Sequence, residues 1–70
     1  MKAANLIKMA NQIGAFFEAM PNREEAVKDV AAHLQKYWEP RMRDALHQYV
    51  RETGDAELSV IVRDALPLLK

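Results

Sequence analysis

The chain has 70 residues, half of them hydrophobic, and ten basic side chains balance ten acidic ones. A chain this short forms one domain at most, here residues 1–70, and it buries only enough apolar surface for marginal stability. The lack of Cys excludes disulfides, thiolate zinc sites and cysteine-held iron–sulfur clusters, and the neutral charge argues against nucleic-acid binding. The apolar runs are too short for a membrane span, and the chain opens with no signal-peptide pattern.

Apolar residues in the first segment recur at steps of three and four, which predicts a helix from about Ala3 to Met20. The apolar stripe of this helix is Leu6, Met9, Ala10, Ile13, Phe16, Phe17 and Met20. Gly14 lies in the middle and costs about 1 kcal/mol relative to Ala. It either permits a neighbouring helix to approach closely or is merely tolerated.

A second helix is predicted after Pro21, which ends the first. Asn22 is the expected N-cap, and Glu25 three residues later completes an Asn version of the capping box. The apolar stripe of this helix is Ala26, Val27, Val30, Ala31, Leu34, Tyr37 and Trp38.

Pro40 is expected in the first turn of a third helix, which ends at Thr53 before a left-handed Gly54. The stripe of this helix is Met42, Ala45, Leu46, Tyr49 and Val50.

Asp55 is the expected N-cap of a fourth helix, which kinks or ends near Leu66 because Pro67 follows. Its stripe is Leu58, Ile61, Val62, Ala65, Leu66 and Leu69. Val60 and Leu68 lie off the stripe, so this helix is apolar on more than one side. Connections of two or three residues favour antiparallel neighbours. The predicted fold is all-α, a small bundle of three to four short antiparallel helices.

The sequence offers little for catalysis or metal binding. His33 and His47 lie on different predicted helices in no ligand spacing, and capping or simple exposure explains Ser59, the only serine. The two glycines are isolated, so no phosphate-binding loop is present. We therefore predict no catalytic, cofactor-binding or metal-binding residues in this chain.

The junction between the second and third predicted helices is the unusual segment, and its residues are Trp38, Pro40, Arg41, Met42 and Arg43. Under one interpretation Trp38 closes the end of the bundle while Pro40 fixes the turn. Under the other, these residues dock a partner, because Trp and Arg are enriched in binding hot spots. The two arginines diverge by about 200° on a helix, so at most one of them faces the bundle.

Several pieces together resemble a known family: Met9 to Gly14 (MANQIG), Phe16-Phe17, Arg23 to Ala26 (REEA), His33-Leu34 and Trp38 to Arg43 (WEPRMR). In this order and spacing, they resemble the delta subunit of the NAD-dependent, molybdenum-containing formate dehydrogenases. The resemblance runs from about Leu6 to Tyr49 and is weaker from Leu58 to Leu66. The family often has Phe where this chain has Tyr37.

This resemblance implies a small accessory subunit of a cytoplasmic enzyme complex that oxidises formate and reduces NAD. The alpha subunit of that complex holds a molybdenum bis-pterin cofactor, and other subunits carry flavin and iron–sulfur centres. The delta subunit is associated with assembly, cofactor insertion or stability of the complex. The family supplies no catalytic residues to carry over to this chain.

Two functions follow as hypotheses. The first is an interaction subunit that presents the junction, with part of the last helix, to the alpha subunit and to other subunits. The alternative is a stand-alone helical regulator that self-associates and binds nucleic acid, against which the neutral charge argues. An enzyme acting alone is the least supported of the classes, and a membrane protein is not expected.

Overall fold

A computed structural model describes residues 2–69, and every regular element in this range is helical. The elements are α1 (Ala3–Glu18), α2 (Arg23–Tyr37), α3 (Pro40–Thr53), α4 (Val60–Ala65) and a 3₁₀ turn, η1 (Leu66–Leu68). The predicted all-α class is therefore confirmed.

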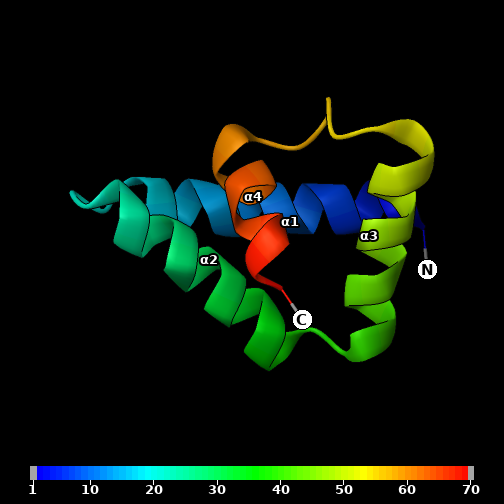
Figure 1. The fold of residues 1–70 in the computed structure, drawn as a ribbon, viewed down its shortest axis with the longest axis horizontal. Coiled ribbons are helices and arrows are strands. Elements are labelled where there is room, and N and C mark those ends of the chain that lie inside the picture. The colour runs from blue at the N-terminus through cyan, green and yellow to red at the C-terminus, as the bar shows by residue number, and fades with distance from the viewer. Residues whose placement is uncertain (1, 70) are drawn as a thin grey trace.

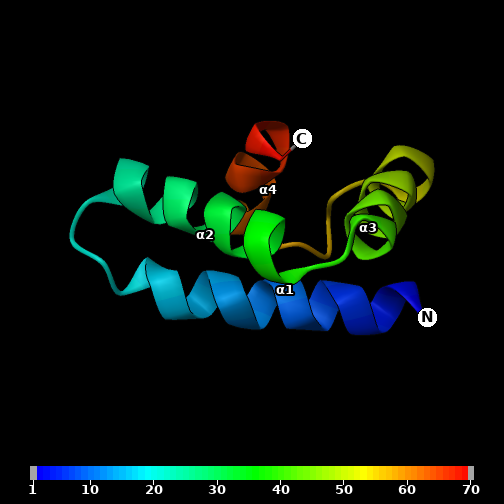
Figure 2. The ribbon, with the colours of Figure 1, turned by 90° about the horizontal axis from the view of Figure 1, so that it is seen from below.

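The helices are arranged around α1, the longest of them (Figures 1 and 2). α2 returns along α1 in the opposite sense, and α3 crosses α1 near its N-terminal end. Residues 54–59 then run back over α1 and lead into α4, which packs on both α1 and α2. The last element is thus seated on the hairpin formed by the first two.

The core consists of apolar side chains where α4 and η1 meet α1 and α2, together with one residue each from the α2–α3 junction, α3 and the 54–59 segment. No buried residue among those described is polar or charged. The largest fully buried side chains are Leu6, Val30, Leu34, Leu46, Leu58, Ile61 and Val62. Burial of these branched side chains is the main source of stability in a chain without disulfides.

Gly14 allows α4 to approach α1 closely. A Cβ atom at this position would lie 2.8 Å from Cγ2 of Ile61 and 2.9 Å from Cγ2 of Val62, closer than carbon atoms pack. Of the two explanations that the sequence leaves open, close approach by a neighbouring helix is the one that the structure confirms.

Local signals place most helix ends correctly. The Asn22 side chain accepts a hydrogen bond from the Glu25 backbone N–H at 3.0 Å, so the predicted N-cap of α2 is confirmed. Pro40 is in the first turn of α3, and α4 ends at Ala65 where Pro67 tightens the chain into η1. Gly54 has a positive φ of 96° with a ψ of 178°, a region that essentially only glycine enters.

Two expected helix ends are wrong. α1 ends at Glu18 rather than Met20: Met20 directly precedes Pro21 and is disfavoured in α geometry, and its N–H donates to the Phe17 carbonyl in a tighter turn. The last helix starts with Ser59 as its N-cap residue, not Asp55, and residues 55–58 form a turn in which the Leu58 N–H donates to the Asp55 carbonyl.

Two N-cap residues offer a matched test of capping. Asn22→Ala should destabilise the chain by about 1 kcal/mol, because it removes the acceptor for the Glu25 N–H. Ser59→Ala should leave stability unchanged or raise it, because the buried Ser59 hydroxyl has no hydrogen-bond partner among the described residues. Urea unfolding of both variants checks the difference, and equal losses would contradict it.

The predicted stripes also include side chains that the structure leaves outside the core. Met9, Phe16 and Tyr37 are exposed by 41%, 75% and 65%. The seven-residue stripe of α1 is wider than the side that faces the core, which runs through Leu6 and Ala10. Met9 and Phe16 lie on a neighbouring side of the same helix, where the described part of the chain does not cover them.

Candidate interaction surfaces

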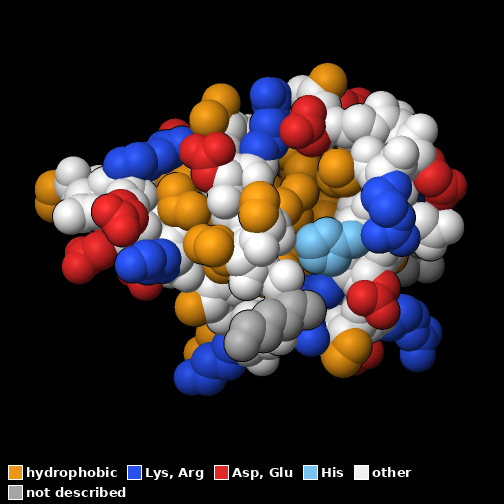
Figure 3. Space-filling view, in the orientation of Figure 1, with side chains coloured by type: hydrophobic (Ala, Val, Ile, Leu, Met, Phe, Trp, Pro, Cys, Tyr) orange, Lys and Arg blue, Asp and Glu red, His pale blue; other side chains and the backbone are white. Residues whose placement is uncertain are grey.

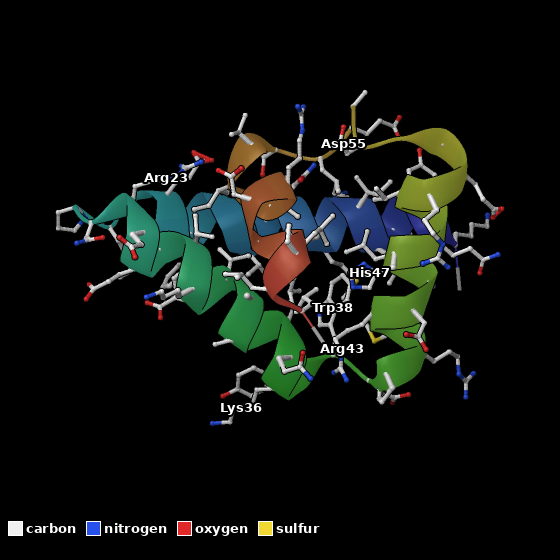
Figure 4. The ribbon with its side chains drawn as sticks, in the orientation of Figure 1. Arg23, Lys36, Trp38, Arg43, His47 and Asp55 are labelled. Atoms are coloured by element: carbon white, nitrogen blue, oxygen red, sulfur yellow. The ribbon has the colours of Figure 1, made fainter. Side chains whose placement is uncertain are left out.

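Trp38 belongs to the core of the chain itself. It follows the last residue of α2 and is only 5% exposed, and its backbone N–H donates to the Leu34 carbonyl. Figure 4 shows it beside Arg43 and His47, where the end of α2 faces α3. The burial of Trp38 matches the interpretation in which it closes the end of the bundle, and docking of a partner at the junction stays a prediction.

The two arginines of the junction behave differently, as their spacing on α3 predicts. Arg43 turns inward, and its Nη1 donates to the carbonyls of Gln35 and Trp38, which ties α3 to the end of α2. Arg41 is exposed, as is Pro40, while Met42 is half-buried against the core. Of the five candidate residues, Pro40 and Arg41 are therefore the ones that remain open to a partner.

A side-chain amide on α1 holds the segment that leads into α4. Asn11 Nδ2 donates to the Glu57 carbonyl at 3.0 Å, and Asn11 Oδ1 accepts from the Ser59 backbone N–H at 2.9 Å. Arg63 Nε, on α4, donates to the Leu58 carbonyl at 2.9 Å. The sequence analysis did not predict this role of Asn11. The one pattern that could have indicated it is the position of Asn11 on α1, three residues before Gly14. Asn11 and Gly14 together seat α4 on α1.

The same segment is also attached to α3. The Tyr49 hydroxyl donates to the Glu57 carboxylate. This hydrogen bond raises the pKa of Tyr49 above its ordinary value, and partial burial and the negative charge of Glu57 add to the effect. Because the folded-state pKa is the higher one, the stabilisation is present below the ordinary tyrosine pKa and is lost as pH rises through the folded-state value.

This pKa shift can be measured directly. In the Tyr37→Phe variant Tyr49 is the only tyrosine, and absorbance titration should place its pKa above about 10. Adding Glu57→Gln should move the pKa down, because both the strong acceptor and the negative charge are removed. An unchanged pKa in the double variant would show that Glu57 is not the cause.

An apolar groove lies between α1 and α2. We call it the α1–α2 groove, and its lining residues are Met9, Gln12, Ile13, Phe16, Phe17 and His33. Its volume is about 410 Å³. An aromatic row crosses one side of it, with ring centroids 5.1 Å apart for Phe16 and Phe17, 6.0 Å for Phe17 and His33, and 4.8 Å for His33 and Tyr37. Sequence reasoning missed the groove because it assigned Phe16 and Tyr37 to the core.

A second apolar region lies over α4. Figure 3 shows apolar side chains gathered there, with charged side chains around them. Val60 and Leu68 are exposed by 58% and 51%. The prediction that these two residues make the last helix apolar on more than one side is confirmed.

We also searched the described residues for a metal site and for a membrane-spanning helix. Within residues 2–69, no group of three His, Cys, Asp or Glu side chains could hold a metal ion. In the same range, no helix is long and apolar enough to cross a membrane. The His33 ring packs against the rings of Phe17 and Tyr37.

The fold is that of a small all-α protein, and several large apolar side chains among the described residues are exposed on it. A family model described as the NADH-dependent formate dehydrogenase delta subunit FdsD matches residues 5–66. The match spans most of the chain, so this protein belongs to that family. Searches of curated proteins and of solved structures find no match.

Proposed function

We propose that this chain is a non-catalytic accessory subunit of a cytoplasmic NAD-dependent formate dehydrogenase, and that it supports assembly, cofactor insertion or stability of the complex. The observation that carries the proposal is the family match over residues 5–66. The alpha subunit is the proposed main partner, with contacts to other subunits of the complex.

The chemistry of the reaction is assigned to the partner subunits under this proposal. The molybdenum bis-pterin cofactor, the flavin and the iron–sulfur centres are expected there, as the resemblance implies. This chain has no Cys to ligate a cluster. Its part in the complex is therefore proposed to be the contact itself.

Co-purification tests the proposal. The tagged full-length chain is expressed with the other subunits, and its amount per alpha subunit is measured in the purified enzyme. A ratio near one supports a permanent subunit. A much lower ratio, together with less molybdenum per alpha subunit in cells that lack the chain, supports a transient maturation role. Failure of a folded, tagged chain to recover any formate dehydrogenase subunit would overturn the proposal.

A further inference from the structure

We infer that the α1–α2 groove receives a short apolar segment of the alpha subunit, and that Phe16 and Met9 are its principal contacts. This inference rests on the proposed function, which supplies the partner. The groove is a different surface from the junction that sequence reasoning favoured.

The composition of α1 is the first reason. Its 16 residues include only two charged ones, Lys8 and Glu18. A surface helix normally has one apolar stripe and a charged opposite face, whereas a helix with apolar residues on more than one side is normally covered on those sides. Among the described residues, the side through Leu6 and Ala10 is covered, whereas the side through Met9 and Phe16 is open.

The chemistry of the groove defines its occupant. None of the six lining residues is a carboxylate, a lysine or an arginine. Only Gln12 and His33 provide polar groups, so a charged occupant would lose its hydration without gaining an opposite charge. An aliphatic or aromatic segment has no charge to desolvate there, and the flexible Met9 side chain can adapt to its shape.

The size of the groove favours a segment of a larger partner over a second copy of this chain. A stable dimer typically buries about 800 Å² on each partner with about 20–30 residues a side. That area is about a sixth of the 4679 Å² surface of this chain, and the six lining residues of the groove are too few to form one side of such a dimer. A groove of about 410 Å³ can instead take a few apolar side chains from one inserted segment, in the way that groove-binding domains take the apolar face of an amphipathic helix.

The α1–α2 groove also offers a partner more exposed apolar surface than the α2–α3 junction does. At the junction, Trp38 is buried and Arg43 is engaged with backbone carbonyls, so few large side chains remain for a partner. At the groove, Phe16 has 75% of its surface exposed and lies in edge-to-face contact with Phe17. Exposed aromatic side chains that are already held in place by neighbours lose little freedom on binding.

Co-purification of paired variants tests the inference. Phe16→Glu places a charge in the groove, and Leu68→Glu makes the same kind of change at an exposed apolar residue of the α4 region. Each tagged full-length variant is expressed with the other formate dehydrogenase subunits, and its amount per alpha subunit is measured. Phe16→Glu is expected to lower this ratio at least tenfold, while Leu68→Glu keeps it within twofold of the wild type.

Two controls make every outcome decisive. Circular dichroism of the isolated variants should show both folded, because both replaced side chains are mainly exposed. Should Phe16→Glu fail to fold, Phe16→Ser replaces it in the same assay. Sedimentation of the isolated wild-type chain tests for a second copy, and a dimer that Phe16→Glu dissociates would assign the groove to self-association and overturn the inference.

The failure of this inference differs from failure of the proposed function. Recovery of Phe16→Glu at the wild-type ratio, or equal loss of Leu68→Glu, overturns the groove as the docking site while the accessory role stands. Recovery of no formate dehydrogenase subunit by the wild-type chain overturns the proposed function itself.

Discussion

Replacing Trp38 with Ala should lower the free energy of unfolding by about 3–5 kcal/mol, because a buried indole is removed and a cavity is left behind. A 70-residue domain has a total stability of only about 3–10 kcal/mol, so much of the chain would unfold at moderate temperature. The carbonyl of residue 38 remains in the variant, so the hydrogen bond from Arg43 is not removed directly. Thermal unfolding should show a midpoint lower by at least about 12 °C.

Tyr37→Ala is the matched control for this prediction. Tyr37 precedes Trp38 in the chain and is also aromatic, but 65% of its surface is exposed, so its loss should cost less than about 1 kcal/mol. Equal destabilisation by the two variants would contradict the assignment of Trp38 to the core. Trp38→Phe should keep most of the stability, and this variant should still bind the complex, because the side chain acts inside the bundle.

The structure shows which sequence signals act locally and which need the whole fold. Asn22 and Pro40 mark the starts of α2 and α3 through their own side-chain or backbone chemistry, so the sequence predicts these two starts correctly. Asp55 has the chemistry of an N-cap but does not serve as one. The segment after it is held by side chains from α1, α3 and α4, and these contacts fix where the last helix starts.

Dependence on the whole fold also explains why the sequence did not predict the α1–α2 groove. Helical periodicity gives the apolar sides of α1, but it does not tell which side the chain covers and which it leaves for a partner. Phe16 and Leu6 belong to the same predicted stripe, yet Phe16 is exposed and Leu6 is 1% exposed. The difference depends on where α2, α3 and α4 pack on α1, and therefore on contacts between residues distant in the sequence.

Gly14→Leu is expected to release α4 from α1 and to destabilise the chain by at least about 3 kcal/mol. Burial of a Val or Ile side chain contributes about 1.5–3 kcal/mol, and a Leu side chain at position 14 would occupy the space of both Ile61 and Val62. Both residues are fully buried and β-branched, so neither has an easy alternative rotamer. Denaturant unfolding measures the loss, and amide hydrogen exchange should show faster exchange in α4 than in α2.

Ala15→Leu separates this packing effect from helix propensity. Residue 15 is the next position of α1 and is exposed, so a Leu there should change stability by no more than about 0.5 kcal/mol. Leu also has a higher helix propensity than Gly, so any loss in Gly14→Leu cannot come from α1 itself. A Gly14→Leu variant as stable as Ala15→Leu would show that α4 can move outward without cost. In that case the side chain of Asn11, rather than close approach at Gly14, would be what holds α4 in place.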